Sequence, residues 1–132
     1  MKDDEISQLI LNAVESRKHA YAPYSHYPVG AALLTKSGKV FTGVNVENAA
    51  YPTTICAERV AVFKAVSEGE RDFQAIAVVT SNGGPPCGSC RQVLAEFNTN
   101  MEVLIADQEG RLVSKMTVAE LLPSAFTPKD LK

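Results

Sequence analysis

The positions of the three cysteines constrain this chain more than any other feature of its sequence. All three lie in two short stretches, Cys56-Ala57-Glu58 and Pro86-Cys87-Gly88-Ser89-Cys90. A helix is predicted directly after each stretch, over Arg59 to Glu68 and over Arg91 to Phe97, so each cysteine group lies at a helix N-terminus. If the fold brings the two helix starts together, the three sulfurs can share one metal ion.

Three cysteines in this arrangement fit a catalytic zinc ion. A lone Cys-x-x-Cys also fits a redox pair, half of a structural zinc knuckle or two buried thiols. A structural zinc site needs four protein ligands, but the chain has no fourth cysteine, and its histidines, His19 and His26, lie outside any ligand spacing. Three ligands and one open position are typical of catalytic zinc, so we predict that Cys56, Cys87 and Cys90 bind Zn²⁺.

The residues after Cys56 fit a catalytic role for this metal. On a regular helix the Glu58 side chain leaves in a different direction from Cys56, which suits a proton carrier above the open coordination position. The alternative is a solvated glutamate in a first helical turn. Arg59 could hydrogen-bond a ligand sulfur and offset the surplus charge of three thiolates, as could the helix N-termini. Its position fits an ordinary surface arginine equally well.

Composition indicates one globular domain, residues 1–132, that needs no disulfide to hold its core. Apolar residues make up 45% of the chain and charged residues 21%. The net charge of −2 and the absence of a basic run argue against a nucleic-acid partner, since such partners are bound largely through their phosphates. The N-terminus resembles neither a signal nor a transit peptide, and no apolar run is long enough for a membrane span. We therefore expect a cytoplasmic protein without a membrane partner.

Apolar periodicity predicts an α/β fold. A first helix is predicted over Asp4 to about Tyr21, followed by a hairpin of two strands, 29–35 and 39–46. The rest of the chain is predicted as a helix (59–68), a strand (73–80), a helix (91–97) and two strands (102–106 and 112–116). A Thr117–Glu120 capping box opens a last short helix. Crossovers through the two middle helices predict a three-layer α/β/α sandwich around a mixed five-stranded sheet. Both cysteine-headed helices would then start on the same side of the sheet.

Several segments resemble known proteins. Cys-Ala-Glu followed by Pro-Cys-Gly-Ser-Cys resembles the zinc signature of the nucleoside deaminases. The segments 24–32, 41–51 and 90–93 resemble the small cytidine deaminases that assemble as homotetramers, and the similarity extends to Phe126. This resemblance implies a cytidine deaminase-like fold and zinc-dependent hydrolytic deamination of cytidine and 2′-deoxycytidine, a step of pyrimidine salvage.

The resemblance also implies roles for individual residues. Cys56, Cys87 and Cys90 would bind zinc, and Glu58 would shuttle protons while activated water attacks C4. The implied substrate contacts are Asn45, Val46 and Glu47 on the sugar, Tyr27 stacked on the pyrimidine, Ala57, and Phe126 reaching the pocket of a neighbouring subunit. Tyr27 stands where phenylalanine is usual, although a tyrosine can still stack. Asn45 and Glu47 also fit a turn at a strand end, and Phe126 a plain core aromatic.

Three other functions remain to be weighed. Blasticidin-S deaminases share the cysteine motifs and the size, but the Asn45-Val46-Glu47 segment favours a simple nucleoside. A polynucleotide or tRNA deaminase would have histidine in place of Cys56 and would need positive charge. A non-catalytic module stabilised by zinc would leave Glu58 without a role. We expect a small-molecule nucleoside substrate.

Overall fold

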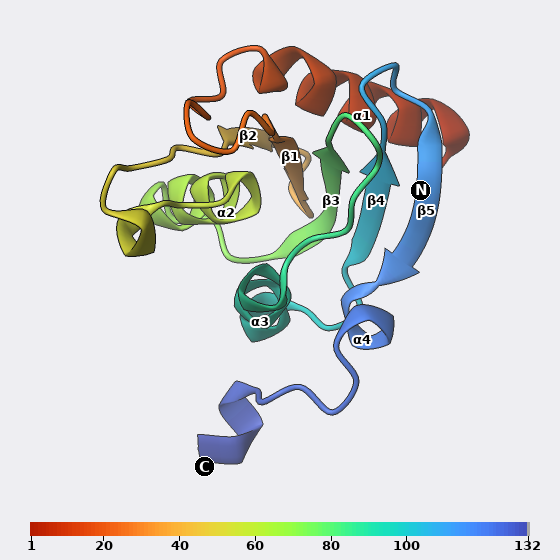
Figure 1. Cartoon of the computed structure of the whole chain (residues 1–132). Helices are drawn as coiled ribbons and strands as arrows, with labels where there is room; N and C mark the ends of the chain where they lie inside the picture. The colour runs from red at the N-terminus through yellow and green to blue at the C-terminus, as the bar shows by residue number, and fades with distance from the viewer. Residues whose placement is uncertain (132) are drawn as a thin grey trace.

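The computed structural model of the chain describes residues 1–131, and Lys132, the last residue of the predicted domain, lies outside the described residues. Five strands form one mixed sheet in the order β2–β1–β3–β4–β5 (Figure 1). The strands are β1 (Gly30–Thr35), β2 (Val40–Val44), β3 (Phe73–Val79), β4 (Glu102–Ala106) and β5 (Leu112–Thr117). The α-helices are α1 (Asp3–Arg17), α2 (Ala57–Ser67), α3 (Gly88–Phe97) and α4 (Val118–Leu121), and short 3-10 helices cover Tyr51–Thr53 and Pro128–Leu131. The predicted mixed five-stranded sheet is confirmed.

The strand directions explain why the two cysteine-headed helices start at the same place. β1 pairs antiparallel with both β2 and β3, so β2 and β3 run in the same direction; β3 is parallel to β4, and β4 is antiparallel to β5. α2 follows β2 and α3 follows β3. Both helices therefore start at the edge of the sheet where these parallel strands end, the usual place for a ligand site in an α/β fold.

Helices cover both faces of the sheet, which confirms the three-layer sandwich (Figure 1). Alternate residues of the buried strand β3 point to opposite layers, as the period of two requires. Ile76 and Val78 pack in the cluster that contains Ala61 and Val62 of α2, whereas Ala75, Ala77 and Val79 pack in the cluster formed with α1. The continuous apolar run of this segment correctly predicted a strand that is covered on both faces.

α2 packs close to the sheet, and a glycine makes this approach feasible. A Cβ atom added to Gly43 of β2 would lie 2.3 Å from the carbonyl oxygen of Ala57 and 2.5 Å from the backbone nitrogen of Ala61. Such distances leave no room for any side chain at this position. Gly43 therefore sets the height above the sheet of the helical turn that carries Glu58.

Two predicted element ends are wrong, for the same reason. The first helix ends at Arg17 rather than near Tyr21, and β2 ends at Val44 rather than at Val46. Tyr21 instead forms a backbone bridge to Val46, and Val46 forms a second one to Ile55. These pairings join segments that are far apart in the sequence, so local periodicity could not predict them. The predicted Thr117–Glu120 capping box is confirmed, with the Glu120 N–H donating to Thr117 Oγ1 at 3.2 Å.

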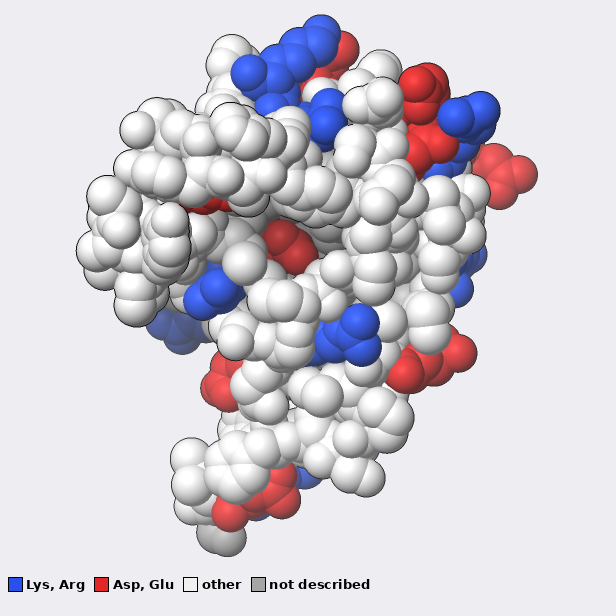
Figure 2. All heavy atoms as spheres, viewed as in Figure 1, with Lys and Arg blue, Asp and Glu red and all other residues white. Residues whose placement is uncertain are grey.

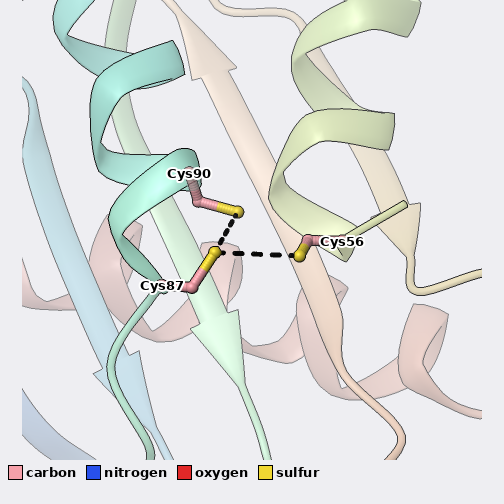
Figure 3. A group of neighbouring side chains, drawn as sticks. All are labelled: Cys56, Cys87 and Cys90. Atoms are coloured by element: carbon pink, nitrogen blue, oxygen red, sulfur yellow. Dashed lines mark hydrogen bonds between the residues drawn. The ribbon is translucent and has the colours of Figure 1, made fainter. Parts of the chain in front are cut away.

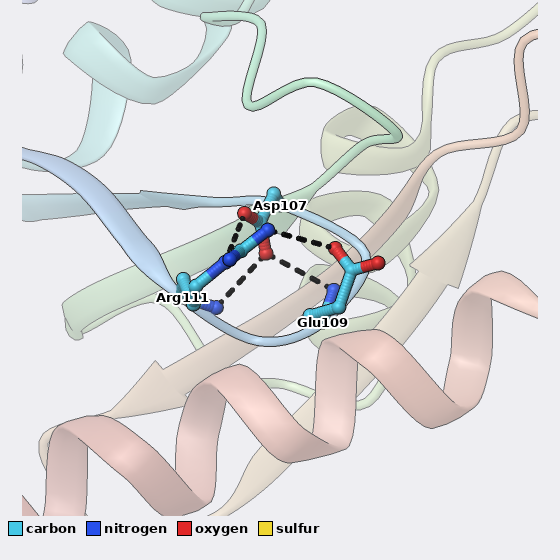
Figure 4. Close-up of polar contacts among 3 residues, drawn as sticks. All are labelled: Asp107, Glu109 and Arg111. Carbon is cyan, nitrogen blue, oxygen red and sulfur yellow. Dashed lines mark hydrogen bonds and ion pairs between the residues drawn. The ribbon is translucent and has the colours of Figure 1, made fainter.

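The turn between β4 and β5 is held by a compact polar cluster (Figure 4). The Asp107 carboxylate accepts hydrogen bonds from the backbone N–H groups of Glu109 and Arg111, both at 3.0 Å, and from Arg111 Nε at 2.9 Å. These contacts hold the pKa of Asp107 below its usual range, chiefly through the Arg111 N–H. The cluster stabilises the turn predicted at 108–110. Among residues 1–131, no helix is long and apolar enough to cross a lipid bilayer.

Candidate metal centre and active site

The fold brings the three cysteine sulfurs to one point (Figure 3). Cys56 occupies the position just before α2, Cys87 the position just before α3, and Cys90 lies in the first turn of α3. The Cys87 Sγ lies 3.5 Å from the Cys90 Sγ and 3.9 Å from the Cys56 Sγ, and all three sulfurs lie within 4.8 Å of one another. A tetrahedral zinc ion with Zn–S bonds of about 2.3 Å sets its sulfur ligands about 3.8 Å apart. The three side chains therefore fit a zinc ion with little movement.

The electrostatics of the sulfur cluster also favour a cation. The neighbouring Cys90 thiol and the Arg59 guanidinium lower the pKa of the Cys56 thiol to about 5. The same contact with Cys56, together with burial, raises the pKa of the Cys90 thiol. One thiolate thus forms readily and opposes ionisation of its neighbours. A metal ion removes this conflict, since it binds thiolates and displaces their protons.

Arg59 lies directly against this cluster. Its Nη2 atom donates a hydrogen bond to the Cys56 Sγ at 3.1 Å. This bond raises the pKa of the guanidinium further above its usual value, so the positive charge stays beside the sulfurs at any relevant pH. A fixed positive charge there partly offsets the negative charge of the thiolates.

Glu58 lies in the first turn of α2 and is almost fully buried, with 4% of its surface exposed. Burial raises the pKa of its carboxyl group, and the nearby Cys56 thiolate adds to the rise. A buried carboxyl group beside a metal-ligand set is the type of group that serves as general acid and base in such sites. Its side chain lines the same cavity as Cys56 and Cys87.

This cavity has a volume of about 270 Å³ and lies between the start of α2 and the loop that joins β3 to α3. Figure 2 shows the corresponding hollow, with acidic side chains inside it and mostly uncharged side chains around its rim. Tyr27, Asn45, Glu47 and Ala57 line it together with the residues named above. The volume is close to the lower end of the range for small-molecule sites, about 300 Å³.

Asn45 and Glu47 are buried, and both hold the loop that precedes β1. Asn45 Oδ1 accepts from the Val29 N–H at 2.9 Å, and its Nδ2 donates to the Tyr27 carbonyl at 3.0 Å. The Glu47 carboxylate accepts from the N–H groups of residues 24 and 25, both at 3.0 Å, and from the Ser25 hydroxyl. These bonds, that of the Ser25 hydroxyl first, lower the pKa of Glu47. A carboxylate and an amide with further hydrogen-bonding capacity thus face the cavity.

Some predicted residues do not reach this cavity. Val46 is 42% exposed and points away from it, because successive side chains of an extended segment alternate in direction. Its backbone N–H and carbonyl pair with Ile55 instead, both at 3.0 Å. Phe126 is 56% exposed and lies outside the cavity of its own chain, while its carbonyl accepts a bond from Gln92 Nε2 at 2.7 Å. His19 and His26 are exposed and take no part in the sulfur cluster.

Sequence reasoning missed other residues that line or support the cavity. Ser25 lies within one of the segments that carry the resemblance, yet its bond to Glu47 joins residues distant in sequence. Thr80 follows the buried strand β3, and a polar residue directly after a central strand is a signal that could have been used. For Asn82, which contacts Tyr27, the sequence offers no signal.

Comparisons with known proteins agree with this geometry. A family model described as the cytidine and deoxycytidylate deaminase zinc-binding region matches residues 3–106. A protein of Sporosarcina psychrophila named cytidine deaminase is 51% identical, over 96% of this chain and 95% of that protein. One of Halalkalibacterium halodurans with the same name is 52% identical, over 93% of this chain and 95% of that protein.

A solved structure of cytidine deaminase from Burkholderia pseudomallei superposes with a TM-score of 0.87 at 46% identity, covering 96% of this chain and 100% of that one. A Bacillus cereus protein named blasticidin-S deaminase is less similar, at 35% identity over 96% of this chain and 99% of that protein. The matched region contains both cysteine stretches, including Glu58. The chain therefore belongs to the cytidine and deoxycytidylate deaminase family.

Proposed function

We propose that this protein catalyses the hydrolytic deamination of cytidine and 2′-deoxycytidine, which gives uridine or 2′-deoxyuridine and ammonia. One observation carries this proposal. The three sulfur atoms and the buried Glu58 carboxyl meet in one cavity, and Asn45 and Glu47 line the same cavity. A metal ligand set, a proton carrier and hydrogen-bonding groups for a sugar are what this reaction requires.

Glu58 moves the protons of the reaction. When zinc is bound by Cys56, Cys87 and Cys90, it supplies Lewis acidity that lowers the pKa of a water molecule. The Glu58 carboxylate takes one proton from the attacking water and delivers it to ring N3 as the oxygen bonds to C4. It then carries the second proton of that oxygen to the amino group, so the C4–N bond breaks, ammonia leaves and a C4 carbonyl remains. Arg59 holds the Cys56 sulfur and offsets part of the thiolate charge during these steps.

The remaining residues favour a nucleoside over a free base. Asn45 and Glu47 are fixed by the backbone of the preceding loop and retain capacity for ribose hydroxyl groups. The Tyr27 ring offers an aromatic face to the pyrimidine, and Ala57 lines the cavity next to Glu58. Because Asn45 and Glu47 are buried, a substrate without a sugar leaves part of their hydrogen-bonding capacity unused and away from water, which disfavours the free base.

We further propose that the chain acts as a homotetramer whose pockets are completed by neighbouring subunits. Phe126 supports this proposal, because it is a largely exposed aromatic outside its own cavity; Phe63 on α2 is also 49% exposed. Aromatic side chains are enriched at protein–protein interfaces relative to the rest of the surface. Light scattering after size exclusion should give four times the chain mass. A stable, fully active monomer would contradict this assembly.

We also propose that the chain is one domain, acts in the cytoplasm and serves pyrimidine salvage. A single sheet contacts the helices on both of its faces, which supports one domain within residues 1–131.

The function is tested by the ultraviolet absorbance of cytidine in the presence of purified, zinc-loaded protein, with cytosine and blasticidin S assayed alongside. Loss of the cytidine band with one ammonia released per cytidine, and no change for cytosine, is the expected result. Turnover of blasticidin S without turnover of cytidine would assign the protein to the blasticidin-S deaminases. Bound zinc without turnover of any of the three would leave only a structural role for the metal.

A further inference from the structure

The loop that joins β3 to α3, residues 80–86, is tied across the cavity by a hydrogen bond that the proposed reaction does not use. The Tyr27 hydroxyl donates to Asn82 Oδ1 at 2.7 Å. The Thr80 hydroxyl donates to the same oxygen at 3.3 Å, and the Gly84 N–H donates to Thr80 Oγ1 at 2.8 Å. A side chain from the segment before β1 thus completes a network with the loop that leads directly into Cys87.

The packing of this loop leaves it little freedom. A Cβ atom added to Gly84 would lie 2.6 Å from the Tyr27 hydroxyl oxygen, so the loop backbone touches that side chain. On its other flank, a Cβ atom added to Gly83 would lie 2.6 Å from Val113 Cγ2 of β5. The loop is therefore held between Tyr27 and β5, and it cannot move to either side without displacing one of them.

The proposed reaction fixes which edge of the substrate this loop faces. C4 of the cytosine must lie at the metal position, and N3 must face Glu58, which belongs to α2. C5 adjoins C4 on the side of the ring opposite N3, so the C5 edge points away from α2. The cavity wall on that side is the β3–α3 loop, of which Thr80, Gly84 and Pro85 line the cavity.

We propose that the hydrogen bond between Tyr27 and Asn82 keeps this wall fixed and thereby excludes substituents on C5 of the cytosine ring. The inference rests on the proposed function and adds a substrate limit to the same site. The Tyr27 hydroxyl and the Asn82 amide act as positioning groups, because they contact the loop rather than the reacting atoms. A fixed wall favours unsubstituted cytidine and penalises a methyl group that must push the loop outward.

The test is the ratio of kcat/KM for cytidine to kcat/KM for 5-methylcytidine. The wild-type protein should prefer cytidine. Tyr27→Phe keeps the aromatic ring and removes only the hydroxyl, and Asn82→Ala removes its acceptor. Since one neutral hydrogen bond changes an equilibrium by about threefold to tenfold, either substitution should lower the ratio by about that factor. Asn82→Ala already removes the acceptor of the Tyr27 hydroxyl, so the double variant should lower the ratio no further than Asn82→Ala alone.

Two control variants separate this effect from a general loss of structure. Asn82→Asp keeps an oxygen acceptor for the tyrosine and should retain most of the wild-type ratio. Tyr21→Phe removes a hydroxyl for which no hydrogen bond is present among residues 1–131, and it should leave the ratio unchanged. Zinc content and circular dichroism establish that each variant is folded. If Tyr27→Phe does not fold, Asn82→Ala carries the test alone.

The outcomes are distinct. A lowered ratio in Tyr27→Phe and Asn82→Ala, with Asn82→Asp close to wild type, supports the inference. An equal loss for both substrates, an unchanged ratio, or a wild-type protein that turns over both substrates equally well would overturn it. Absence of cytidine turnover by the wild-type protein would overturn the proposed function first, and that failure is visible before any variant is compared.

Discussion

Gly43→Ala tests whether the height of α2 above the sheet controls the active site. The added Cβ atom would lie 2.3 Å from the Ala57 carbonyl oxygen, whereas an ordinary contact begins at 3.4 Å. The neighbouring atoms are helix backbone, which cannot rotate away as a side chain does. α2 must therefore move away from β2 by about 1 Å. This displacement carries Cys56 and Glu58 with it, because both lie at the start of that helix.

Gly43→Ala should lower both the free energy of unfolding and the rate of deamination. Overpacking of this kind costs about 1–3 kcal/mol of unfolding free energy. A shift of about 1 Å in a group that positions the reaction costs about 10²-fold in rate. We expect urea unfolding to show the loss of unfolding free energy, and the rate of cytidine deamination at saturating zinc to show the loss of activity. The matched control for stability is Gly88→Ala, where an added Cβ meets nothing within 4 Å; its unfolding free energy should be unchanged or raised by up to about 1 kcal/mol.

If Gly43→Ala kept wild-type stability and at least half of the wild-type rate, the close contact between α2 and β2 would not be what positions Glu58.

Three further predictions concern the metal and the cavity. Removing zinc with a chelator should lower the melting temperature, and one equivalent of zinc should restore it, since binding to the folded state alone adds stability. Asn45→Ala should cost about 1–3 kcal/mol in urea unfolding, because it leaves the Val29 N–H and the Tyr27 carbonyl without their partner. Ser25→Ala should raise the pKa of Glu47 in a carboxyl NMR titration. The lowered pKa of Glu47 gives a stabilisation that is fully present above the unfolded-state pKa and is lost as pH falls through the folded-state pKa. In the variant this stabilisation should be smaller, and its loss should be complete at a higher pH.

Much of the fold could be predicted because its strongest signals are local. The continuous apolar run before Thr80 marks a buried central strand, and the two cysteine stretches mark the helix starts. The position of β1 between β2 and β3 could not be read from periodicity. Neither could the backbone bridges that end α1 and β2 early, since they join Tyr21 to Val46 and Val46 to Ile55. Tertiary pairing decided those boundaries.

The site residues also fall into those that the sequence could indicate and those that it could not. Spacing alone indicated the zinc ligands and Glu58, because a shared metal imposes a fixed pattern on nearby residues. Asn45, Glu47 and Tyr27 came only from resemblance, and the structure adds that the first two also hold the backbone of the preceding loop. The bond from Tyr27 to Asn82 could not be predicted from the sequence, because it depends on the path of a loop that starts after β3.

The role of Glu58 as the proton carrier is tested by comparing ammonia release from cytidine by the wild-type protein and by Glu58→Gln, at zinc contents shown to be equal by mass spectrometry. Glutamine keeps the size of the side chain and removes its ability to carry a proton. We expect the variant to retain zinc and to lose about 10²–10⁴-fold in kcat. Retention of most of the wild-type rate at equal zinc content would show that Glu58 does not move the protons of this reaction.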